Sequence, residues 1–455
     1  MSEVHIENKM STMPVKKLLI TMATPMMISM LMQALYNVVD SIFVAKLSQD
    51  ALASVSIAFS MQNLMIAVAV GTGVGVNSLL SKSLGEKDFE DANRISGNSI
   101  FLAFCTYLAF MLFGVFGTRW FFEVQTADTS IVNYGTDYLE IILIGSIGLF
   151  FQVCMERLLT STGKTHLSMV VQITGAVINI ILDPIMIFGY LGCPALGVRG
   201  AAIATILGQM SAALMGVFLN LKKNGEITLA VKYIKPIKSV IKRIYIVAIP
   251  TIVMQSILSV MALLFNKILL TFSTTAVAVY GVYIKLQNFI FMPVFGINNG
   301  VVPIVSYNYG ARNRRRIIDT MKFAIVLAVS IMVIGVLLFE LAPGLLFSMF
   351  KSGDAVEDAK MMEIGIKALR IIAIHFPIAG ICIVMSAIFQ ALGAPVYSLF
   401  VSIGRQLVVL IPAAYLLSLT GNLDLVWLSY PIAELMSLGL SLVFFKKAKK
   451  RIEFE

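Results

Sequence analysis

The sequence predicts an all-α polytopic membrane protein with twelve transmembrane helices in two six-helix bundles related by a pseudo-twofold axis. Three observations support this fold class: the chain is very apolar, its apolar runs number twelve, and its halves repeat each other. Hydrophobic residues make up 58% of the 455 residues and charged residues only 13%, whereas soluble domains average about 25% charged residues. This composition excludes an ordinary soluble enzyme.

Twelve apolar runs, separated by turn residues or charged clusters, are candidates for the membrane spans. Several exceed 25 residues, so we expect those helices to be tilted, bent or longer than the bilayer is thick. The runs cover residues 15–44, 51–82, 95–122, 134–160, 166–190, 200–221, 240–271, 277–309, 320–350, 362–391, 395–419 and 425–445.

The basic residues predict the orientation of the spans. With both termini on the cytoplasmic side, the terminal segments and the loops on that side hold 25 Lys and Arg residues, against 7 on the other side. This asymmetry follows the positive-inside rule, so the sequence predicts a multi-pass plasma (inner) membrane protein with cytoplasmic N- and C-termini. The net charge of +10 arises from these short loop clusters, which gives no reason to expect a nucleic-acid partner.

The second half of the chain repeats the first. At a shift of 225 residues, or 230 further along the chain, identical residues coincide: Pro25 with Pro250, Gly71 with Gly296, Gly85 with Gly310, and Gly163 with Gly393. Since each half has an even number of spans, the halves share one orientation and are related by an axis along the membrane normal. We expect a first lobe at residues 1–221, a basic cytoplasmic linker at 222–239, and a second lobe with a basic C-terminal segment at 240–455.

Several motifs, in order and in duplicate, resemble those of MATE (multidrug and toxic compound extrusion) transporters. They are the segment LSKSLGEKDFEDA from Leu80, its partner VSYNYGARNRRR from Val305, Thr162–Thr165, Asn179-x3-Asp183-Pro184 and Ala201–Thr205. The resemblance implies a two-lobed antiporter that exchanges organic cations for protons or sodium ions. It also implies membership of the branch with its acidic cation site in the first half.

Two aspartates inside predicted spans are the main candidates for ion coupling. Asp40 and Asp183 lie at similar depths in spans 1 and 5, and intramembrane acids are usually functional because burying them is costly. Tyr36 and Asn179 lie one helical turn before them on the same faces. With Thr205, these residues would hold a proton or a sodium ion, the latter at Asp40, Asp183 and Asn179; alternatively, Asp40 only caps span 1 at the headgroups.

Proline in the middle of span 1 predicts an irregularity there. Pro25 removes one helical hydrogen bond, so bending at this position is a candidate for gating coupled to Asp40. A static kink is equally consistent with the sequence, because membrane helices tolerate proline.

The second half lacks equivalents of the two aspartates, since Phe265 and Ala413 occupy their repeat positions. Four of its ionisable residues are expected to be buried, and two interpretations are open. They form a polar site for an ion or a substrate, or they form a structural pair. Intramembrane charges usually pair, which favours a neutralising contact between the residues of spans 11 and 12. The four candidates are Lys285, His375, Arg405 and Glu434.

The sequence therefore predicts a secondary active antiporter that exports amphipathic, often cationic drugs by alternating access, driven by H+ and/or Na+. We expect a monomer in contact with membrane lipid, without cofactor, ATP or enzymatic activity; the Gly163-Lys164-Thr165 triplet lacks the earlier glycine of a phosphate-binding loop. The alternatives are a lipid-linked oligosaccharide flippase of the same superfamily, an integral membrane enzyme acting on lipids, and a channel.

Overall fold

The computed structural model describes residues 8–45, 47, 49–350 and 355–453, and within these ranges it contains helices and no strand. In chain order the elements are α1 (Lys9–Thr12), α2 (Val15–Ala45), α3 (Gln49–Gly85), α4 (Phe89–Glu123), α5 (Thr129–Ile144), α6 (Ile147–Ser161), α7 (Thr165–Phe188), η1 (Tyr190–Gly192), α8 (Val198–Lys223), η2 (Val231–Tyr233), α9 (Lys238–Leu270), α10 (Thr274–Gly310), α11 (Arg314–Leu341), α12 (Pro343–Ser348), α13 (Ala355–Ala373), α14 (Phe376–Ala391), α15 (Pro395–Ile403), η3 (Gly404–Leu410), α16 (Ile411–Ser418), α17 (Leu423–Trp427), α18 (Ser429–Lys449) and η4 (Lys450–Ile452).

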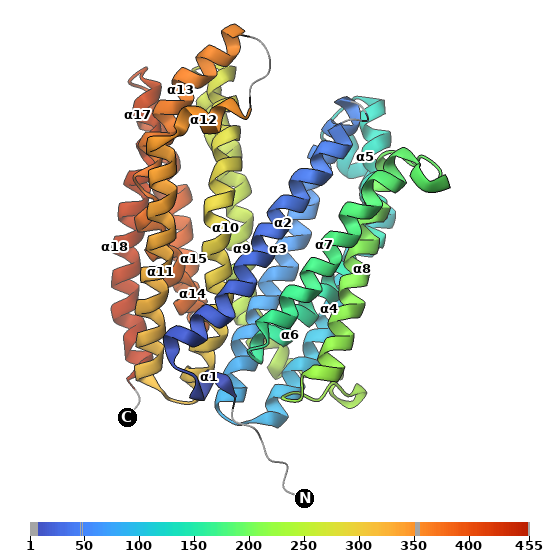
Figure 1. Cartoon of the computed structure of the whole chain (residues 1–455), viewed down its shortest axis with the longest axis vertical. Helices are drawn as coiled ribbons and strands as arrows, with labels where there is room; N and C mark the ends of the chain where they lie inside the picture. Colours follow the sequence, from blue (N-terminus) through green and yellow to red (C-terminus); the bar gives the residue numbers. More distant parts are fainter. Residues whose placement is uncertain (1–7, 46, 48, 351–354, 454–455) are drawn as a thin grey trace, which may run out of the picture.

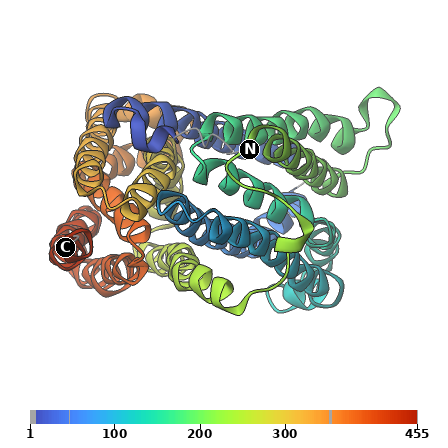
Figure 2. The ribbon, with the colours of Figure 1, turned by 90° about the horizontal axis from the view of Figure 1, so that it is seen from below.

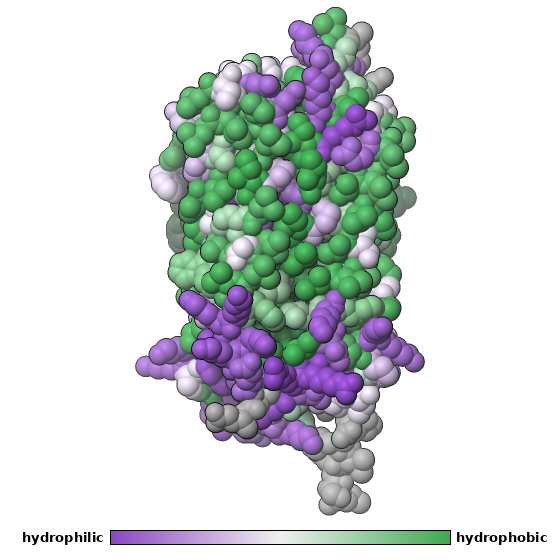
Figure 3. Space-filling model, turned by 90° about the vertical axis from the view of Figure 1, so that its left-hand side faces the viewer, coloured by the Kyte–Doolittle hydropathy of each residue, from purple (hydrophilic) through white to green (hydrophobic). Residues whose placement is uncertain are grey.

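The twelve predicted spans are present. Ten spans are single helices or near-continuous helical segments that are long and apolar enough to cross a membrane. The other two are bent pairs, α5 with α6 at 44° and α13 with α14 at 51°. Between its polar ends the molecule shows a broad hydrophobic belt (Figure 3), as expected for a surface that faces lipid.

The helices form two groups, which we call the first half (α2–α8) and the second half (α9–α18). In Figure 1 the two groups lie close together at the lower end and diverge toward the upper end, and Figure 2 shows them side by side from below. Helix α10 packs against α2 and α3, and α3 packs against α9. The contact between the halves is therefore made by the helices that begin each half.

Both α1 and the end of α18 lie at the lower end of the molecule in Figure 1. The ends of α3, α8 and α18 that lie there carry Lys residues, and Arg312 follows the end of α10. Hydrophilic side chains gather at this end in Figure 3. We call this the basic end and the other the opposite end.

Backbone geometry at the basic end repeats between the halves. Lys87 and Arg312 both have positive φ, 60° and 55°. The next residues, Asp88 and Asn313, each accept a hydrogen bond from a backbone N–H in the first turn of the following helix. Positive φ disfavours residues with a side chain, so the same uncommon turn at positions 225 apart shows that the sequence repeat is a structural one.

The two halves approach each other closely at paired glycines. A Cβ added to Gly85 would lie 2.0 Å from the carbonyl oxygen of Tyr307, and one added to Gly310 would lie 2.2 Å from that of Lys82. These four residues are two repeat pairs, so the approach is reciprocal about the pseudo-twofold axis. Only residues without a side chain allow the ends of α3 and α10 to be this close.

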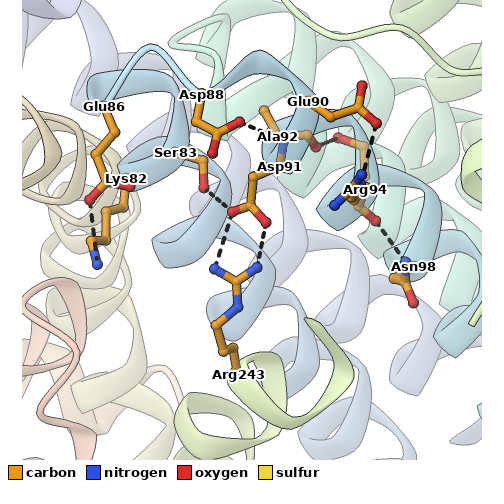
Figure 4. A network of polar contacts seen from close by, with 11 residues as sticks. Lys82, Ser83, Glu86, Asp88, Glu90, Asp91, Ala92, Arg94, Asn98 and Arg243 are labelled. Carbon is orange, nitrogen blue, oxygen red and sulfur yellow. Dashed lines mark hydrogen bonds and ion pairs between the residues drawn. The ribbon is translucent and has the colours of Figure 1, made fainter. Parts of the chain in front are cut away.

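Polar contacts join the helices of the basic end further (Figure 4). Asp91 of α4 accepts hydrogen bonds from Ser83 of α3 at 2.7 Å and from both terminal nitrogens of Arg243 of α9 at 2.5 and 3.1 Å. Because α9 belongs to the second half, this bidentate contact ties the halves together. Bidentate Arg–carboxylate pairs are among the more strongly oriented surface contacts.

Candidate functional site

The best-defined buried polar site lies between α7 and α8, toward the opposite end. Asp183 is fully buried and Asn179 is 3% exposed. The side-chain amide of Asn179 lies 3.3 Å from Oδ1 of Asp183 and 3.4 Å from Oγ1 of Thr205. With the amide rotated, its nitrogen donates to Asp183 Oδ2 at 3.3 Å and its oxygen accepts from the Thr205 N–H at 3.2 Å. Asn179 contacts both neighbours in either orientation.

Local sequence explains why these groups meet. Asn179 and Asp183 are four residues apart on α7, which puts them on one face. Helix α8 comes close to that face because Gly208 packs against Gly175 and Asn179; a Cβ at Gly208 would lie 2.8 Å from the Gly175 carbonyl oxygen. Small residues at such crossings bring membrane helices close together, and here they bring Thr205 of α8 to Asn179.

The structure places the other first-half candidates on α2, the helix packed against α7. Tyr36 is half-buried there. Asp40 lies in α2 as well, but its side chain lies outside the described part of the structure. Helix α2 is continuous from Val15 to Ala45 through Pro25, so the predicted irregularity does not interrupt the helix.

The donor set of this site suits a proton or a hard monovalent cation. Carboxylate, amide and hydroxyl oxygens are present in a site closed to bulk solvent, and a buried carboxylate strongly favours any bound charge that neutralises it. Among the described residues there is no cluster of three or more His, Cys, Asp or Glu side chains that would hold a transition metal. Reversible binding of a proton or of such a cation is the chemistry that these oxygen atoms can support.

In the second half the structure brings Arg405 and Glu434 together. The Arg405 guanidinium lies 3.3 Å from Oε2 of Glu434, whose side chain is only 3% exposed. Arg405 belongs to η3, a seven-residue π-helix that interrupts span 11, and such segments are rare outside functional or strained sites. Oε1 of Glu434 has no hydrogen-bond partner among the described residues.

Aromatic residues fill the position that repeats Asp40. Phe265 is fully buried, and its ring centre lies 4.8 Å from Tyr280, 5.5 Å from Tyr430 and 6.1 Å from Trp427. Ring centres at these separations make favourable tilted and edge contacts. The second half is therefore packed with rings at the place where the first half carries an acid.

The remaining second-half candidates differ from each other. His375 is buried, with Nδ1 in contact with the Ile372 carbonyl oxygen and its ring 5.4 Å from that of Tyr430. The expectation that Lys285 is buried is wrong: it is exposed on α10, and its ammonium lies 5.8 Å from the ring of Phe350. The apolar run around Lys285 could not reveal which face of α10 it occupies.

Two polar contacts escaped the sequence reasoning. The side-chain amide of Gln172 on α7 donates to that of Gln33 on α2 at 3.0 Å. Arg157 of α6 donates to Asn299 of α10 at 2.8 Å, which joins the halves. Gln33 lies one turn before Tyr36, and Gln172 lies two turns before Asn179. This helical spacing from the candidate residues could have indicated that the two glutamines share their faces.

Comparisons with known proteins agree with this architecture. The MatE family model matches residues 25–185 and 250–416, one stretch in each half. The multidrug export protein MepA of Staphylococcus haemolyticus is 27% identical over 439 residues, covering 96% of this chain and 94% of the relative. A solved outward-facing structure of a multidrug resistance MATE family transporter of the MOP superfamily is 26% identical, with a TM-score of 0.88 over 96% of each chain. A MOP superfamily transporter from Pyrococcus furiosus is 25% identical, with a TM-score of 0.90 over 98% of this chain and 97% of the other. This chain belongs to the MatE family.

Proposed function

We propose that this protein is a secondary active antiporter of the plasma membrane that exports amphipathic, often cationic drugs in exchange for protons or sodium ions. The observation that carries the proposal is the match, over nearly the whole chain, to relatives named as multidrug export proteins. The buried carboxylate site at Asp183 supplies the group that such an exchange requires.

The basic end is the cytoplasmic end in this proposal, because membrane proteins concentrate Lys and Arg in short cytoplasmic loops. The opposite end, toward which the halves diverge in Figure 1, then faces outward. The lobes are residues 1–221 and 240–455, joined by the linker at 222–239, and the transporter acts as a monomer without ATP.

Cation binding at Asp183 drives the conformational cycle. In the outward-facing state an ion from outside binds the carboxylates of Asp183 and Asp40, with Asn179 and Thr205 completing its environment. The ion shifts the equilibrium between the outward-facing and inward-facing states only because it binds one of these states more tightly than the other. Neutralising Asp183 removes the cost of enclosing a charge, so the loaded protein closes to the outside, releases the ion inside and accepts drug. Pro25 gives α2 a position at which it bends during this change.

The test is efflux of ethidium, a planar organic cation, from proteoliposomes under an imposed pH or sodium gradient. Asp183→Asn should fold and insert normally but lose gradient-driven efflux. Asp137→Asn is the matched control, because Asp137 is a partly exposed aspartate that pairs with Arg199 at 2.8 Å near the opposite end; it should transport normally. Unchanged efflux by Asp183→Asn would remove that residue from the mechanism.

The flippase alternative requires several cationic side chains that are free to bind a pyrophosphate. Arg405 is paired with Glu434, Arg157 donates one hydrogen bond to the neutral Asn299, and Lys285 is a single exposed lysine. These contacts favour the drug antiporter.

A further inference from the structure

Polar side chains continue below the Asp183 site along the contact between α2 and α7. Gln33 and Gln172 join the two helices by a 3.0 Å hydrogen bond. Ser29 lies one turn before Gln33 and is fully buried, and Ser168 lies one turn before Gln172 and is 1% exposed. With Thr165, the first residue of α7 and fully buried, we call these five residues the α2/α7 seam.

The seam lies in line with the carboxylate site. Residues 165, 168, 172, 179 and 183 fall within about 60° of one another around α7 at 100° per residue. On α2, residues 29, 33 and 36 share one face in the same way. The opposite face of α2 is occupied, since Ala23 and Met27 lie against Gly300 and Gly296 of α10. The polar face of α2 is therefore the one available to α7.

Four buried oxygen atoms of the seam lack hydrogen-bond partners within the described part of the chain. Oγ of Ser29, Oγ of Ser168, Oγ1 of Thr165 and Oε1 of Gln172 have no hydrogen-bond partner among the described residues. Hydroxyls in membrane helices commonly donate to a carbonyl one turn earlier, as Thr174 does to Val170 at 2.8 Å. Each buried polar group left unpaired costs about 1–3 kcal/mol, a cost that bound water or a cation in the seam would offset.

The seam and the carboxylate site together have the length and ends of a path. Eighteen residues separate Asp183 from Thr165, which is about 27 Å along an α-helix and close to the thickness of the hydrocarbon core. Thr165 follows Lys164 at the basic end, where the Lys164 ammonium lies 3.9 Å from Oε1 of Glu226. The seam thus connects the buried carboxylate with the polar surface of the basic end.

We propose that the α2/α7 seam conducts the coupling cation between Asp183 and the basic end, separately from the route taken by the drug. This inference rests on the proposed function. Amides and hydroxyls offer donors and acceptors without fixed charge, and unpaired ones hold water. A proton leaving the Asp183 carboxyl moves along such water to the cytoplasm and leaves the carboxylate ionised; a sodium ion follows the same oxygens. The close packing of α2 on α7 excludes an organic cation.

The experiment compares transport with drug binding in the full-length protein. The double variant Gln33→Met/Gln172→Met keeps side-chain volume but removes the amides. Its ethidium efflux from proteoliposomes should fall at least tenfold under whichever gradient, of pH or of sodium, drives the wild type. Its equilibrium affinity for ethidium, measured by fluorescence, should stay within twofold. Gln172→Asn, which keeps an amide, should retain most of the wild-type rate.

The matched control is Thr174→Val, on the opposite face of α7, which should transport at the wild-type rate. If the glutamine variants do not insert, Ser168→Ala and Ser29→Ala, which add no volume, should together slow efflux about threefold. A wild type without gradient-driven efflux overturns the proposed function and the path with it. Normal wild-type efflux with unchanged rates in the seam variants overturns the path alone.

Discussion

The two halves of this transporter share their loops but not their interiors. At the basic end the two halves repeat each other even in their backbone dihedral angles. Gly163 and Gly393 both have positive φ, 84° and 67°, as do Lys87 and Arg312. Between those loops the first half buries Asp183 beside an amide and a hydroxyl. The second half buries rings and one ion pair.

The comparison of the two halves separates features that maintain the two-lobed architecture from features that would couple transport to an ion. Loops and close helix contacts are duplicated because both halves must meet and move about one axis. The carboxylate of Asp183 is not duplicated, since Ala413 stands at its repeat position, so the proposed exchange uses one half as the ion-binding part. The second half then acts as its packed counterpart.

Breaking the buried pair of the second half should have the largest effect on stability. Glu434→Leu leaves the Arg405 guanidinium without its partner, and removing one member of a buried pair costs about 3–5 kcal/mol. The double variant Arg405→Leu/Glu434→Leu should lose less, because no charge is left unpaired. Thermal unfolding in detergent measures both. Losses that simply add in the double variant would contradict a structural pair, and Asp183→Asn should unfold near the wild-type temperature.

The reciprocal glycines test whether the halves contribute equally to closure of the basic end. Gly85→Ala and Gly310→Ala each force a Cβ against a backbone carbonyl, and overpacking of this kind costs about 1–3 kcal/mol. Both should lower thermal stability by similar amounts. Gly439→Ala, where an added Cβ meets nothing within 4 Å, is the control and should not lower stability, because alanine favours a helix more than glycine does. A large difference between the first two variants would show that the contact is not symmetric in energy.

Glycine substitutions in the duplicated turns should raise stability, a smaller effect than that of the alanine substitutions and of opposite sign. Lys87→Gly and Arg312→Gly each relieve a positive φ, and the gain should be about 0.5–1 kcal/mol after the entropy of glycine is counted. Lys82→Gly, inside α3, should instead lower stability by about 1 kcal/mol. The unfolding temperatures of the three single variants, each compared with the wild type, test both expectations. Destabilisation by either turn variant would mean that its side chain makes a contact worth more than the strain.

The smallest effect on stability concerns a contact at the basic end that involves the segment following α8. Burial raises the pKa of Glu226, an effect partly offset by Lys164, by the Asn8 side chain and by Lys9. The folded protein therefore holds this proton more tightly than the unfolded chain, and stability is lost as pH rises from the ordinary value of 4.5 through the raised pKa. Glu226→Gln should weaken this dependence. Unfolding temperatures measured across that interval would show identical slopes if Glu226 does not contribute.

Hydropathy was sufficient to predict the twelve spans, because span length and the cost of exposing backbone in lipid are local constraints. The repeat followed from identities at a fixed shift. The faces of the helices were not predictable, since a span apolar all round carries little periodicity. For that reason the burial expected of Lys285 was wrong, whereas Asn179 and Asp183, one turn apart on α7, were correctly expected to share a face.

Contacts between helices were predictable only where charge demanded a partner. Arg405 and Glu434 could be expected to pair because neither is stable alone in the bilayer. Nothing in the residues around Gly404–Leu410 indicated a π-helix, and neutral partners such as Gln33 and Gln172 carry no comparable signal. Such contacts depend on how α2 lies against α7, which a single sequence does not specify.

The paired approach of Gly85 and Gly310 constrains how the protein changes shape. Because one rotation axis relates both contacts, a rigid rotation of the halves that separates one separates the other. A rigid rotation of the halves therefore has no intermediate in which only one of the two contacts at the basic end is broken. A leak of drug between the halves during turnover would require one half to deform internally, which its packed core opposes.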